Sequence, residues 1–526
     1  MAANSSVRNP MNVDLDYGPQ TIDAMAFHHT SPLAPLMAHV SQGSKPVFDR
    51  TSTGGVSIDT DDFLDAVLIR IRSYLEGSES IVDSISQSSL RKTVDFNLPL
   101  EGRGMESVIT DIDQYLRYSI RTNHPGFMNP LWGGMNISAL AGEIIASLTN
   151  NSMYTYELAP MATLIEQALI RRMCEIVGFG DGNGTLTTGG SNGNMIGMMC
   201  ARHQVDPLGQ RRGFSGDKLV CFVSAEAHYS VLMAANVLGI GFDNVIKVPC
   251  DIDGKMRCDK LVEEIERAKI NDQIPFCVVA TAGTTVRGAF DPIKEMAEIC
   301  SDYGIWFHVD AAWGGSCLFS AKHSILMDGV ELADSICWDA HKMMGVPLIC
   351  SAFLVKRPEI LRTICSHGNV AHYLFHDESQ DVDLGRISLQ CGRRNDALKL
   401  FLAWREKGDA GWSRLVESYV GLADYLQSLV ESEDKLEMMS ARSWSNVCLR
   451  YTSEGIDHND INRQIRDRII RSGRFMASSS EIGDDVILRP VISNPAVTEE
   501  MLRRFIAEAI QHGDDIIRGI PFSGEI

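Results

Sequence analysis

The hydrophobic pattern between about residue 184 and Val355 alternates between two kinds of segment. Short apolar runs rich in β-branched residues are typical of buried strands, and longer stretches with apolar residues about every three to four positions are typical of helices. The expected strands are Lys218–Ser224, Asn244–Pro249, Phe276–Ala280, Ile305–Asp310, Ser335–Trp338 and Ser351–Val355, and the expected helices are 192–203, 229–238, 258–268 and 291–302. Strands that alternate with helices predict a mainly parallel sheet with helices on both faces.

The segments on either side of this region are mostly helical in pattern. Apolar spacing predicts helices at 60–76, Glu106–Ile120, 137–150 and 158–178 before it, and at 394–407, 412–431, 458–471 and 498–516 after it. Two further strands are expected at Asn446–Tyr451 and Val486–Val491. Residues 366–390 are polar and aperiodic, and a connection of this length inside a compact protein is often a functional loop.

These patterns divide the chain into consecutive parts. Residues 1–55, rich in Ser, Pro, Gly and Asn, are expected to be a flexible N-terminal arm. We expect an N-terminal helical segment at 56–135, a large α/β domain at 136–400 and a small α/β C-terminal domain at 401–526. Parallel sheets bind their ligands beyond the carboxyl ends of the strands, so the functional residues should directly follow the apolar runs.

Composition and charge narrow the class of protein. The 526 residues are 44% hydrophobic and 22% charged, which is typical of a globular protein and excludes a disordered, collagen-like or coiled-coil chain. The formal charge of −20 argues against binding to nucleic acid or to an anionic membrane, since both require basic surfaces. No apolar run reaches the roughly 18 residues of a membrane span, and we find no pattern of a secretory signal.

The 13 cysteines are odd in number, are scattered from Cys174 to Cys448 and form no CxxC pair. Several of them, such as Cys277, lie within apolar runs. We therefore expect reduced cysteines in the core of a cytoplasmic protein, and we expect no metal.

Two motifs offer groups that suit a charged ligand. The stretch Thr187–Asn194 is rich in Gly and small polar residues and runs into a helix, whose free N–H groups are placed to bind a phosphate. The alternative is a simple Gly-rich turn with a helix cap. Asp310 ends a buried strand, where a carboxylate is costly unless hydrogen bonds or a cation satisfy it. It either caps the next element or pairs with a cationic ligand.

Two more candidate residues follow other expected strands. Desolvation at the position of Lys342 is expected to lower the pKa of its amine and make it reactive toward carbonyl groups, and the alternative is a surface Lys in a turn. His228, taken alone, is more commonly a structural residue. A phosphate cradle, an Asp, a His and a Lys at successive strand ends are, however, the set of groups that a pyridoxal phosphate site requires.

With these residues in view, the chain resembles the group II pyridoxal-phosphate-dependent amino acid decarboxylases, and most closely the branch of glutamate, cysteine sulfinate and aspartate decarboxylases. The matching stretches run from about residue 60 to the C-terminus: His124-Pro125, Thr155-Tyr156-Glu157, His228-Tyr229-Ser230, Ala282 through Ile293, Trp306 through Gly315, His341 through Gly345, Gln390 through Arg393, and Val491 through Pro495. The resemblance implies an aspartate-aminotransferase-like fold, the type I fold of pyridoxal phosphate enzymes. It also implies carboxy-lyase activity with pyridoxal 5'-phosphate as cofactor.

The same resemblance implies roles for individual residues. Lys342 would hold the cofactor aldehyde as a Schiff base, and Asp310 would pair with the pyridine nitrogen. The ring would lie between Ala312 and His228. The residues expected around the phosphate are Gly190, Ser191, Thr284, Asp339 and His341. Asp339-Ala340 departs from the Asn-Pro of many relatives, and an acidic side chain is unfavourable beside a phosphate.

The family's mobile-loop tyrosine is matched by Tyr373, inside the aperiodic stretch 366–390. In the family this tyrosine protonates the substrate carbon after carbon dioxide has left. A closing loop also excludes water from the reacting carbon.

For the substrate, Arg489 matches the arginine that receives the distal acidic group in this branch, and an Arg fork suits a carboxylate or a sulfinate. The alternative is a structural ion pair. Pro130 stands where relatives usually carry Gln, and Trp132 where glutamate decarboxylases carry a small polar residue. The other expected pocket residues are Asn129, Ser152 and Tyr154, of which the last two resemble the cysteine sulfinate and aspartate enzymes. A bulky Trp shortens the pocket, which favours a four-carbon acid or its sulfinate over glutamate.

We therefore expect α-decarboxylation of a short acidic L-amino acid, either aspartate to β-alanine or cysteine sulfinate to hypotaurine, by a homodimer with its active sites at the interface. One alternative is a decarboxylase of another amino acid of specialised metabolism. Another is a decarboxylating oxidase that gives an aldehyde, which the match of Tyr373 disfavours. A non-catalytic binding protein is disfavoured by the intact Lys342, Asp310 and His228.

Overall fold

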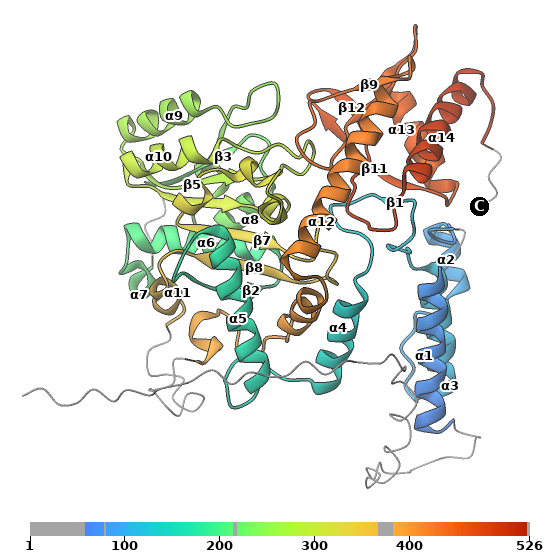
Figure 1. Cartoon of the computed structure of the whole chain (residues 1–526), viewed down its shortest axis with the longest axis horizontal. Helices are drawn as coiled ribbons and strands as arrows, with labels where there is room; N and C mark the ends of the chain where they lie inside the picture. The colour runs from blue at the N-terminus through green and yellow to red at the C-terminus, as the bar shows by residue number, and fades with distance from the viewer. Residues whose placement is uncertain (1–57, 78–79, 214–217, 367–381, 523–526) are drawn as a thin grey trace, which may run out of the picture. The chain divides into compact units, whose positions relative to one another are not determined.

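Figure 1 shows the computed structural model of the protein, which describes residues 58–77, 80–213, 218–366 and 382–522. Ile58–Ile526 form one compact unit. The predicted arm at 1–55 and most of the predicted loop at 366–390, including Tyr373, lie outside the described residues.

The large sheet has the predicted architecture. Its seven strands are paired in the order β2-β8-β7-β6-β5-β3-β4. The strands from β7 to β4 are parallel, whereas β8 runs antiparallel to both β2 and β7. The bounds are β2 Asn183–Thr187, β3 Leu219–Ser224, β4 Val245–Val248, β5 Ile274–Thr281, β6 Trp306–Asp310, β7 Ser335–Asp339 and β8 Ser351–Val355. The prediction of a mainly parallel sheet is confirmed.

Helices cover both faces of this sheet. α6 (Gly190–Val205) and α8 (Ser230–Val237) pack on one side, and α9 (Cys258–Ile270) and α10 (Ile293–Tyr303) lie on the other (Figure 1). Every residue of β3, β6, β7 and β8 is buried. Strands buried on both faces carry continuous apolar runs, which is why the sequence pattern predicts them so directly.

Four strands were not predicted: β1 (Phe127–Met128) and β9 (Leu436–Met438) are very short, and the other two have polar sequences. β2 reads Asn-Gly-Thr-Leu-Thr, and β11 (Met476–Ile482) reads Met-Ala-Ser-Ser-Ser-Glu-Ile. β2 pairs along its whole length with β8, and β11 pairs with β12 (Asp485–Arg489). In both cases the neighbouring strand supplies the hydrogen bonds, so tertiary pairing outweighs the weak local preference.

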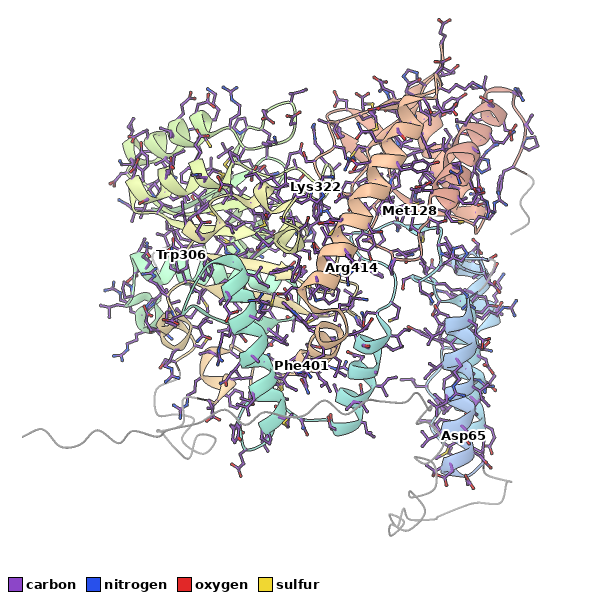
Figure 2. The ribbon with its side chains drawn as sticks, viewed as in Figure 1. Asp65, Met128, Trp306, Lys322, Phe401 and Arg414 are labelled. Carbon is purple, nitrogen blue, oxygen red and sulfur yellow. The ribbon has the colours of Figure 1, made fainter. Side chains whose placement is uncertain are left out.

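A second sheet of five strands has the order β1-β11-β12-β10-β9 and packs with α13 (His458–Arg471) and α14 (Glu499–Ile517). Its remaining strands are β1 Phe127–Met128, β9 Leu436–Met438 and β10 Leu449–Tyr451. β1 comes from much earlier in the chain and pairs in parallel with β11. Met128 therefore lies in this small sheet, whereas Trp306 lies in the large one (Figure 2).

The helices predicted at 394–407 and 412–431 form one element, α12 (Ala397–Glu431), interrupted at Gly408, whose φ is 61°. α12 packs against α4, α5 and α14. The predicted domain boundary at residue 400 falls inside α12, and the division into domains stays a prediction. The other helices are α1 Thr60–Glu76, α2 Gln87–Thr93, α3 Met105–Tyr118, α4 Ile137–Thr149, α5 Pro160–Val177, α7 Gly209–Arg212 and α11 Glu359–Ile364.

Within the described part of the chain, no helix combines the length and the apolar composition that crossing a membrane requires.

Candidate active site

The carboxyl ends of β3, β6 and β7 meet at one edge of the large sheet, and the predicted cofactor residues lie there. Asp310 is the last residue of β6, and Asp339 is the last residue of β7. Lys342 follows β7, and its Nζ lies 3.3 Å from Asp339 Oδ2. His228 follows β3, and both Asp310 and Lys342 act electrostatically on its imidazole. The fold thus brings together the Lys, the Asp and the His that the sequence singles out.

Glycine residues let α6 approach these strand ends closely. A Cβ atom on Gly190 would lie 2.9 Å from Asp339 Oδ2 and 3.0 Å from Ala312 Cβ. Gly193 and Gly197, on the same face of α6, approach β7 and β6 in the same way. A side chain at any of these positions would push the helix away from the sheet. The close approach places the N–H groups of the first turn of α6 at the edge where an anion is expected.

Two residues predicted to hold the phosphate differ in their surroundings. Ser191 is exposed on the first turn of α6, so its hydroxyl is accessible to an anion. Thr284 is fully buried, and its Oγ1 accepts a hydrogen bond from Ala289 N at 3.0 Å, within the loop that follows β5. The link between Thr284 and the phosphate therefore stays a prediction.

The carboxylate of Asp310 is buried but satisfied. Its Oδ1 accepts a hydrogen bond from Ala312 N at 3.1 Å, and its Oδ2 accepts one from Asn194 Nδ2 at 2.7 Å. Hydrogen bonds to the ionised form of a carboxylate stabilise that form. The end of β6 therefore presents a negative charge, which is the partner that a protonated pyridine nitrogen requires.

His228 is held as a neutral ring. Its Nδ1 accepts a hydrogen bond from Ser230 N at 3.2 Å, which leaves the proton on Nε2. Burial lowers the pKa of His228, and the nearby Lys342 lowers it further, although Asp310 opposes this. A neutral imidazole at this edge is suited to stacking on an aromatic ring.

The predicted fall in the pKa of Lys342 is wrong. Burial does act in that direction, but the carboxylates of Asp339 and Asp310 outweigh it, and the pKa of Lys342 is raised. The reason is tertiary, since two acidic strand ends flank one amine. Lys342 is therefore held as a cation and must lose a proton before it reacts with an aldehyde.

Asp339 fits a phosphate less well than its neighbours do. It is buried, its Oδ1 accepts a hydrogen bond from Ser351 Oγ, and its Oδ2 lies 3.5 Å from His341 Nε2. Burial lowers the pKa of His341, so this imidazole provides little positive charge to offset Asp339. The carboxylate lies against Gly190, where the phosphate is expected, and its like charge opposes an anion there.

Arg489 connects the small sheet to this region. It is the last residue of β12, its Nε donates to Ser478 Oγ at 2.9 Å, and its Nη1 donates to the carbonyl oxygen of Thr285. Thr285 belongs to the loop after β5, the strand beside the one that ends in Asp310. Arg489 therefore lies on the side of the sheet that carries the cofactor residues.

Asn129 directly follows β1, a strand of the small sheet that also carries Arg489. Met128 pairs with Ala477, the residue before Ser478, and the carbonyl oxygen of Met128 accepts a hydrogen bond from Val491 N, two residues after Arg489. The buried Oδ1 of Asn129 has no hydrogen-bond partner among the described residues. This acceptor is available to a donor group of a ligand.

The other expected pocket residues fall into two groups. Trp132 packs on Phe127 of β1, with ring centroids 5.9 Å apart, and Pro130 between them lacks an N–H donor. Tyr154 lies instead against the last part of the 366–390 stretch, where Gly385 N donates to Tyr154 O at 2.8 Å, and Ser152 precedes Met153, whose N–H donates to Arg393 O.

Comparison with known proteins identifies the family. Residues 88–452 match the pyridoxal-dependent decarboxylase conserved domain. The chain belongs to the group II pyridoxal-dependent decarboxylases, which act on amino acids as carboxy-lyases with pyridoxal phosphate as cofactor. This confirms the predicted family, type I fold, enzyme class and cofactor.

Three solved structures illustrate the similarity. Mouse CSAD, cysteine sulfinic acid decarboxylase, is 32% identical with a TM-score of 0.82 over 86% of this chain and 98% of that one. The glutamate decarboxylase domain of a Vibrio parahaemolyticus diaminobutyrate-pyruvate transaminase and L-2,4-diaminobutyrate decarboxylase is 25% identical, with a TM-score of 0.78 over 88% of this chain and 97% of that one. Catharanthus roseus tryptophan decarboxylase, at 24% identity, shares the fold, with a TM-score of 0.79 over 87% and 99% of the two chains.

The residues at the sheet edge fit this cofactor. When bound, pyridoxal phosphate supplies an electron sink for the bond that breaks at the α-carbon of the amino acid. Lys342 offers the amine for its aldehyde, Asp310 the charge for its ring nitrogen, and the first turn of α6 the N–H groups for its phosphate. His228 and Ala312 would hold the ring.

The position of Asp339 leads to a first prediction. We expect Asp339→Asn to bind pyridoxal phosphate about tenfold more tightly than the parent, a gain of about 1.4 kcal/mol. Asn keeps an acceptor for Ser351 Oγ and removes the like charge beside Gly190. Absorbance titration of the cofactor-free protein with pyridoxal phosphate and with pyridoxal, which lacks the phosphate, measures this. Losing Asp339 also lowers the pKa of Lys342, which should improve the binding of both pyridoxal phosphate and pyridoxal. An equal gain in affinity for the two ligands would therefore show that the charge of Asp339 does not act on the phosphate.

The raised pKa of Lys342 predicts the pH dependence of cofactor loading. Below that pKa the fraction of free amine rises about tenfold per pH unit, so the loading rate should increase through the neutral and alkaline range. In Asp339→Asn the pKa of Lys342 is lower, and the rise should shift to lower pH. Stopped-flow absorbance after mixing cofactor-free protein with pyridoxal phosphate measures the loading rate against pH for the parent and for Asp339→Asn. The two profiles would coincide if Asp339 did not raise the pKa of Lys342.

Two residues that support this site were missed at the level of sequence. Asn194 follows Gly190 by about one helical turn, and His308 precedes Asp310 by two residues on β6. Helical and strand periodicity put each of them on the same face as a predicted site residue. The sequence contained this periodicity, but the link of both residues to Asp310 follows only from their hydrogen bonds in the folded protein.

Proposed function

We propose that this decarboxylase removes the α-carboxyl group of a short acidic L-amino acid, aspartate or cysteine sulfinate, and releases carbon dioxide. The observation that carries the proposal is Arg489. Its guanidinium is buried, burial lowers its pKa, and its partners are the hydroxyl of Ser478 and the carbonyl of Thr285. Among the described residues no Asp or Glu pairs with it, so an anionic group of a substrate would supply the missing counter-charge.

The choice between acids rests on the segment after β1. Trp132 is anchored on Phe127, and the buried Oδ1 of Asn129 in the same segment has no hydrogen-bond partner among the described residues. A large indole in a substrate pocket would shorten the space for a side chain, which favours a four-carbon acid or its sulfinate over glutamate. The similarity to mouse cysteine sulfinic acid decarboxylase, at 32% identity, supports the same choice.

Arg489→Met should lower kcat/KM for acidic substrates by at least about tenfold, because removing a buried charged partner costs about 2–5 kcal/mol. The loss for neutral amino acids should be smaller. Arg450→Met is the matched control, since Arg450 lies in the same sheet but already pairs with Glu437 and Asp485. The measurement is kcat/KM for aspartate, cysteine sulfinate, glutamate and a neutral amino acid. Equal losses for acidic and neutral substrates would remove Arg489 from substrate recognition.

Trp132→Ser should shift preference toward glutamate, because the smaller side chain leaves room for a longer substrate. The same comparison of kcat/KM across the three acids measures the shift. A parent enzyme that already prefers glutamate or an apolar amino acid would show that this assignment of the pocket is wrong, while the cofactor site would stand.

The product distinguishes an amine-forming decarboxylase from a decarboxylating oxidase. We propose the former, and expect one amine per carbon dioxide with neither aldehyde nor hydrogen peroxide. Coupled assays of the products with the preferred acid measure this ratio. An aldehyde in amounts comparable with carbon dioxide would favour the oxidase instead.

We also propose a cytoplasmic homodimer. α4 exposes apolar side chains at helical spacing, and others are exposed just before and within α5: Ile137, Ile144, Ile145 and Leu148, then Leu158, Met161 and Leu164. Exposed apolar side chains that recur on one face of a helix, as on α4, are typical of an interface with another chain. The cytoplasmic location is supported by free cysteines throughout the described residues. Light scattering of the purified protein measures the oligomeric state, and a monomer at micromolar concentration would contradict the dimer.

A further inference from the structure

A chain of hydrogen bonds runs from the interior of the large sheet to Asp310. Trp306, labelled in Figure 2, donates through Nε1 to Ser335 Oγ at 2.9 Å, and Ser335 Oγ lies 2.8 Å from His308 Nδ1. His308 Nε2 lies 3.0 Å from Asn194 Oδ1, and Asn194 Nδ2 lies 2.7 Å from Asp310 Oδ2. All five side chains are buried, so water does not compete for these bonds.

The donors and acceptors of this chain have one consistent order. A carboxylate only accepts, so the Asn194 amide must turn its NH₂ group toward Asp310 and its carbonyl oxygen toward His308. His308 then donates through Nε2–H. Its Nδ1 accepts the hydroxyl proton of Ser335, whose oxygen receives the N–H of Trp306. Every polar atom of the His308 ring is thus satisfied in the neutral form.

His308 remains neutral because of its surroundings. Burial lowers its pKa to about 4, and the nearby Asp310 only partly opposes this. A neutral His308 orients Asn194 without neutralising Asp310. The negative charge of Asp310 therefore remains available to a cationic ligand.

Asn194 also connects Asp310 to the segment that carries His228. The second proton of its amide is donated to Ser230 Oγ at 2.9 Å, and Ser230 N donates to His228 Nδ1. One buried amide therefore links two groups that meet the cofactor ring. A small error in its orientation would disturb both.

We propose that Asn194, oriented by His308, is a positioning residue that keeps Asp310 ionised and directed at the pyridine nitrogen of the bound cofactor. Without Asn194, Asp310 would retain the single hydrogen bond from Ala312 N. A buried carboxylate with fewer donors holds its charge less well and is free to rotate. The proposal concerns the cofactor alone and is independent of the identity of the substrate.

Three variants test this in the holoenzyme. Asn194→Leu removes the donor to Asp310, and we expect the ring nitrogen to lose its proton and the dissociation constant of pyridoxal phosphate to rise at least about tenfold. His308→Leu removes the group that orients Asn194 and should act in the same direction. His308→Gln keeps a donor at the position of Nε2 and should behave like the parent.

The ring-nitrogen proton is observed directly by ¹⁵N NMR of bound pyridoxal phosphate labelled at that nitrogen, and affinity is measured by absorbance titration. Asn462→Leu is the matched control. Asn462 is as buried as Asn194 and makes three hydrogen bonds, to Tyr451 and His458, in the small sheet and α13. It should lower Tm and leave the ¹⁵N shift and the cofactor affinity unchanged.

The proposal is supported if both Leu variants lose the ring proton and bind the cofactor more weakly. His308→Gln should then keep the proton and the affinity of the parent. The proposal is overturned if the nitrogen stays protonated and affinity stays within about twofold in the Leu variants. It is also overturned if His308→Gln is as impaired as His308→Leu. If Asn194→Leu does not fold, the comparison of the two His308 variants decides.

Discussion

Lys342→Ala is expected to fold, to hold no cofactor covalently and to lower kcat by at least about a thousandfold, or about 4 kcal/mol of activation free energy. Lys342 is the amine at the carboxyl end of β7, flanked by the carboxylates of Asp339 and Asp310. Ala cannot form a bond to an aldehyde. It also leaves Asp339 without its cation, so Tm should fall as well.

The visible absorbance of the purified variant with pyridoxal phosphate and its rate of carbon dioxide release measure this effect. Lys322→Ala is the control, because Lys322, labelled in Figure 2, is exposed and is not one of the predicted cofactor residues. The control should keep both absorbance and turnover. Retained turnover in Lys342→Ala would overturn the assignment of the active site.

Asp310→Asn is expected to weaken cofactor binding by about 1.5–3 kcal/mol, or about 10- to 150-fold, and to lower kcat more than that. Two donors, Ala312 N and Asn194 Nδ2, face the carboxylate. An amide offers only one acceptor oxygen, so one of these donors meets an NH₂ group. The neutral side chain also no longer supports a protonated ring nitrogen.

The measurement separates binding from chemistry, with kcat determined at saturating pyridoxal phosphate. Asp334→Asn is a matched control, because Asp334 accepts a hydrogen bond from Phe307 N at the opposite end of β6. It should leave cofactor binding unchanged. If kcat of Asp310→Asn at saturation equals that of the parent, Asp310 acts only as a cap for the backbone of Ala312.

The large sheet was predictable because its strands are buried on both faces. Such strands are apolar throughout, and the run itself reveals them without knowledge of the partner strand. β2 and β11 lack such runs, and their hydrogen bonds come from strands distant in sequence or from a hairpin partner. A pattern confined to one segment cannot reveal such pairing.

The cofactor residues were predictable for a topological reason. Parallel strands carry the residues that follow them to the same edge of the sheet, so Asp310, Lys342 and His228 were expected to meet before any distance was known. In the fold, Asp310 and Lys342 both lie close enough to His228 to act electrostatically on its imidazole, and Asp310 acts on Lys342 as well. The order of the family motifs added the enzyme class and the cofactor, which the matched domain confirms.

The charge state of this cluster was not predictable in the same way. Burial alone lowers the pKa of a Lys, but the result depends on how many carboxylates lie within a few ångströms. For Lys342 the flanking Asp339 and Asp310 reverse the sign. Distances of this kind are set by the packing of α6 on β6 and β7, which the glycines at 190, 193 and 197 permit.

The sequence by itself therefore determined the strand–helix alternation, the family, and the residues at the strand ends, because each follows from local periodicity or from ordered motifs. Tertiary structure alone decided that β1 joins the small sheet that carries Arg489 and that Asn194 and His308 are hydrogen-bonded in a chain to Asp310. Both arrangements join segments far apart in the chain. Their geometry depends on strand register and helix packing, and these are fixed only when the whole hydrophobic core closes around them.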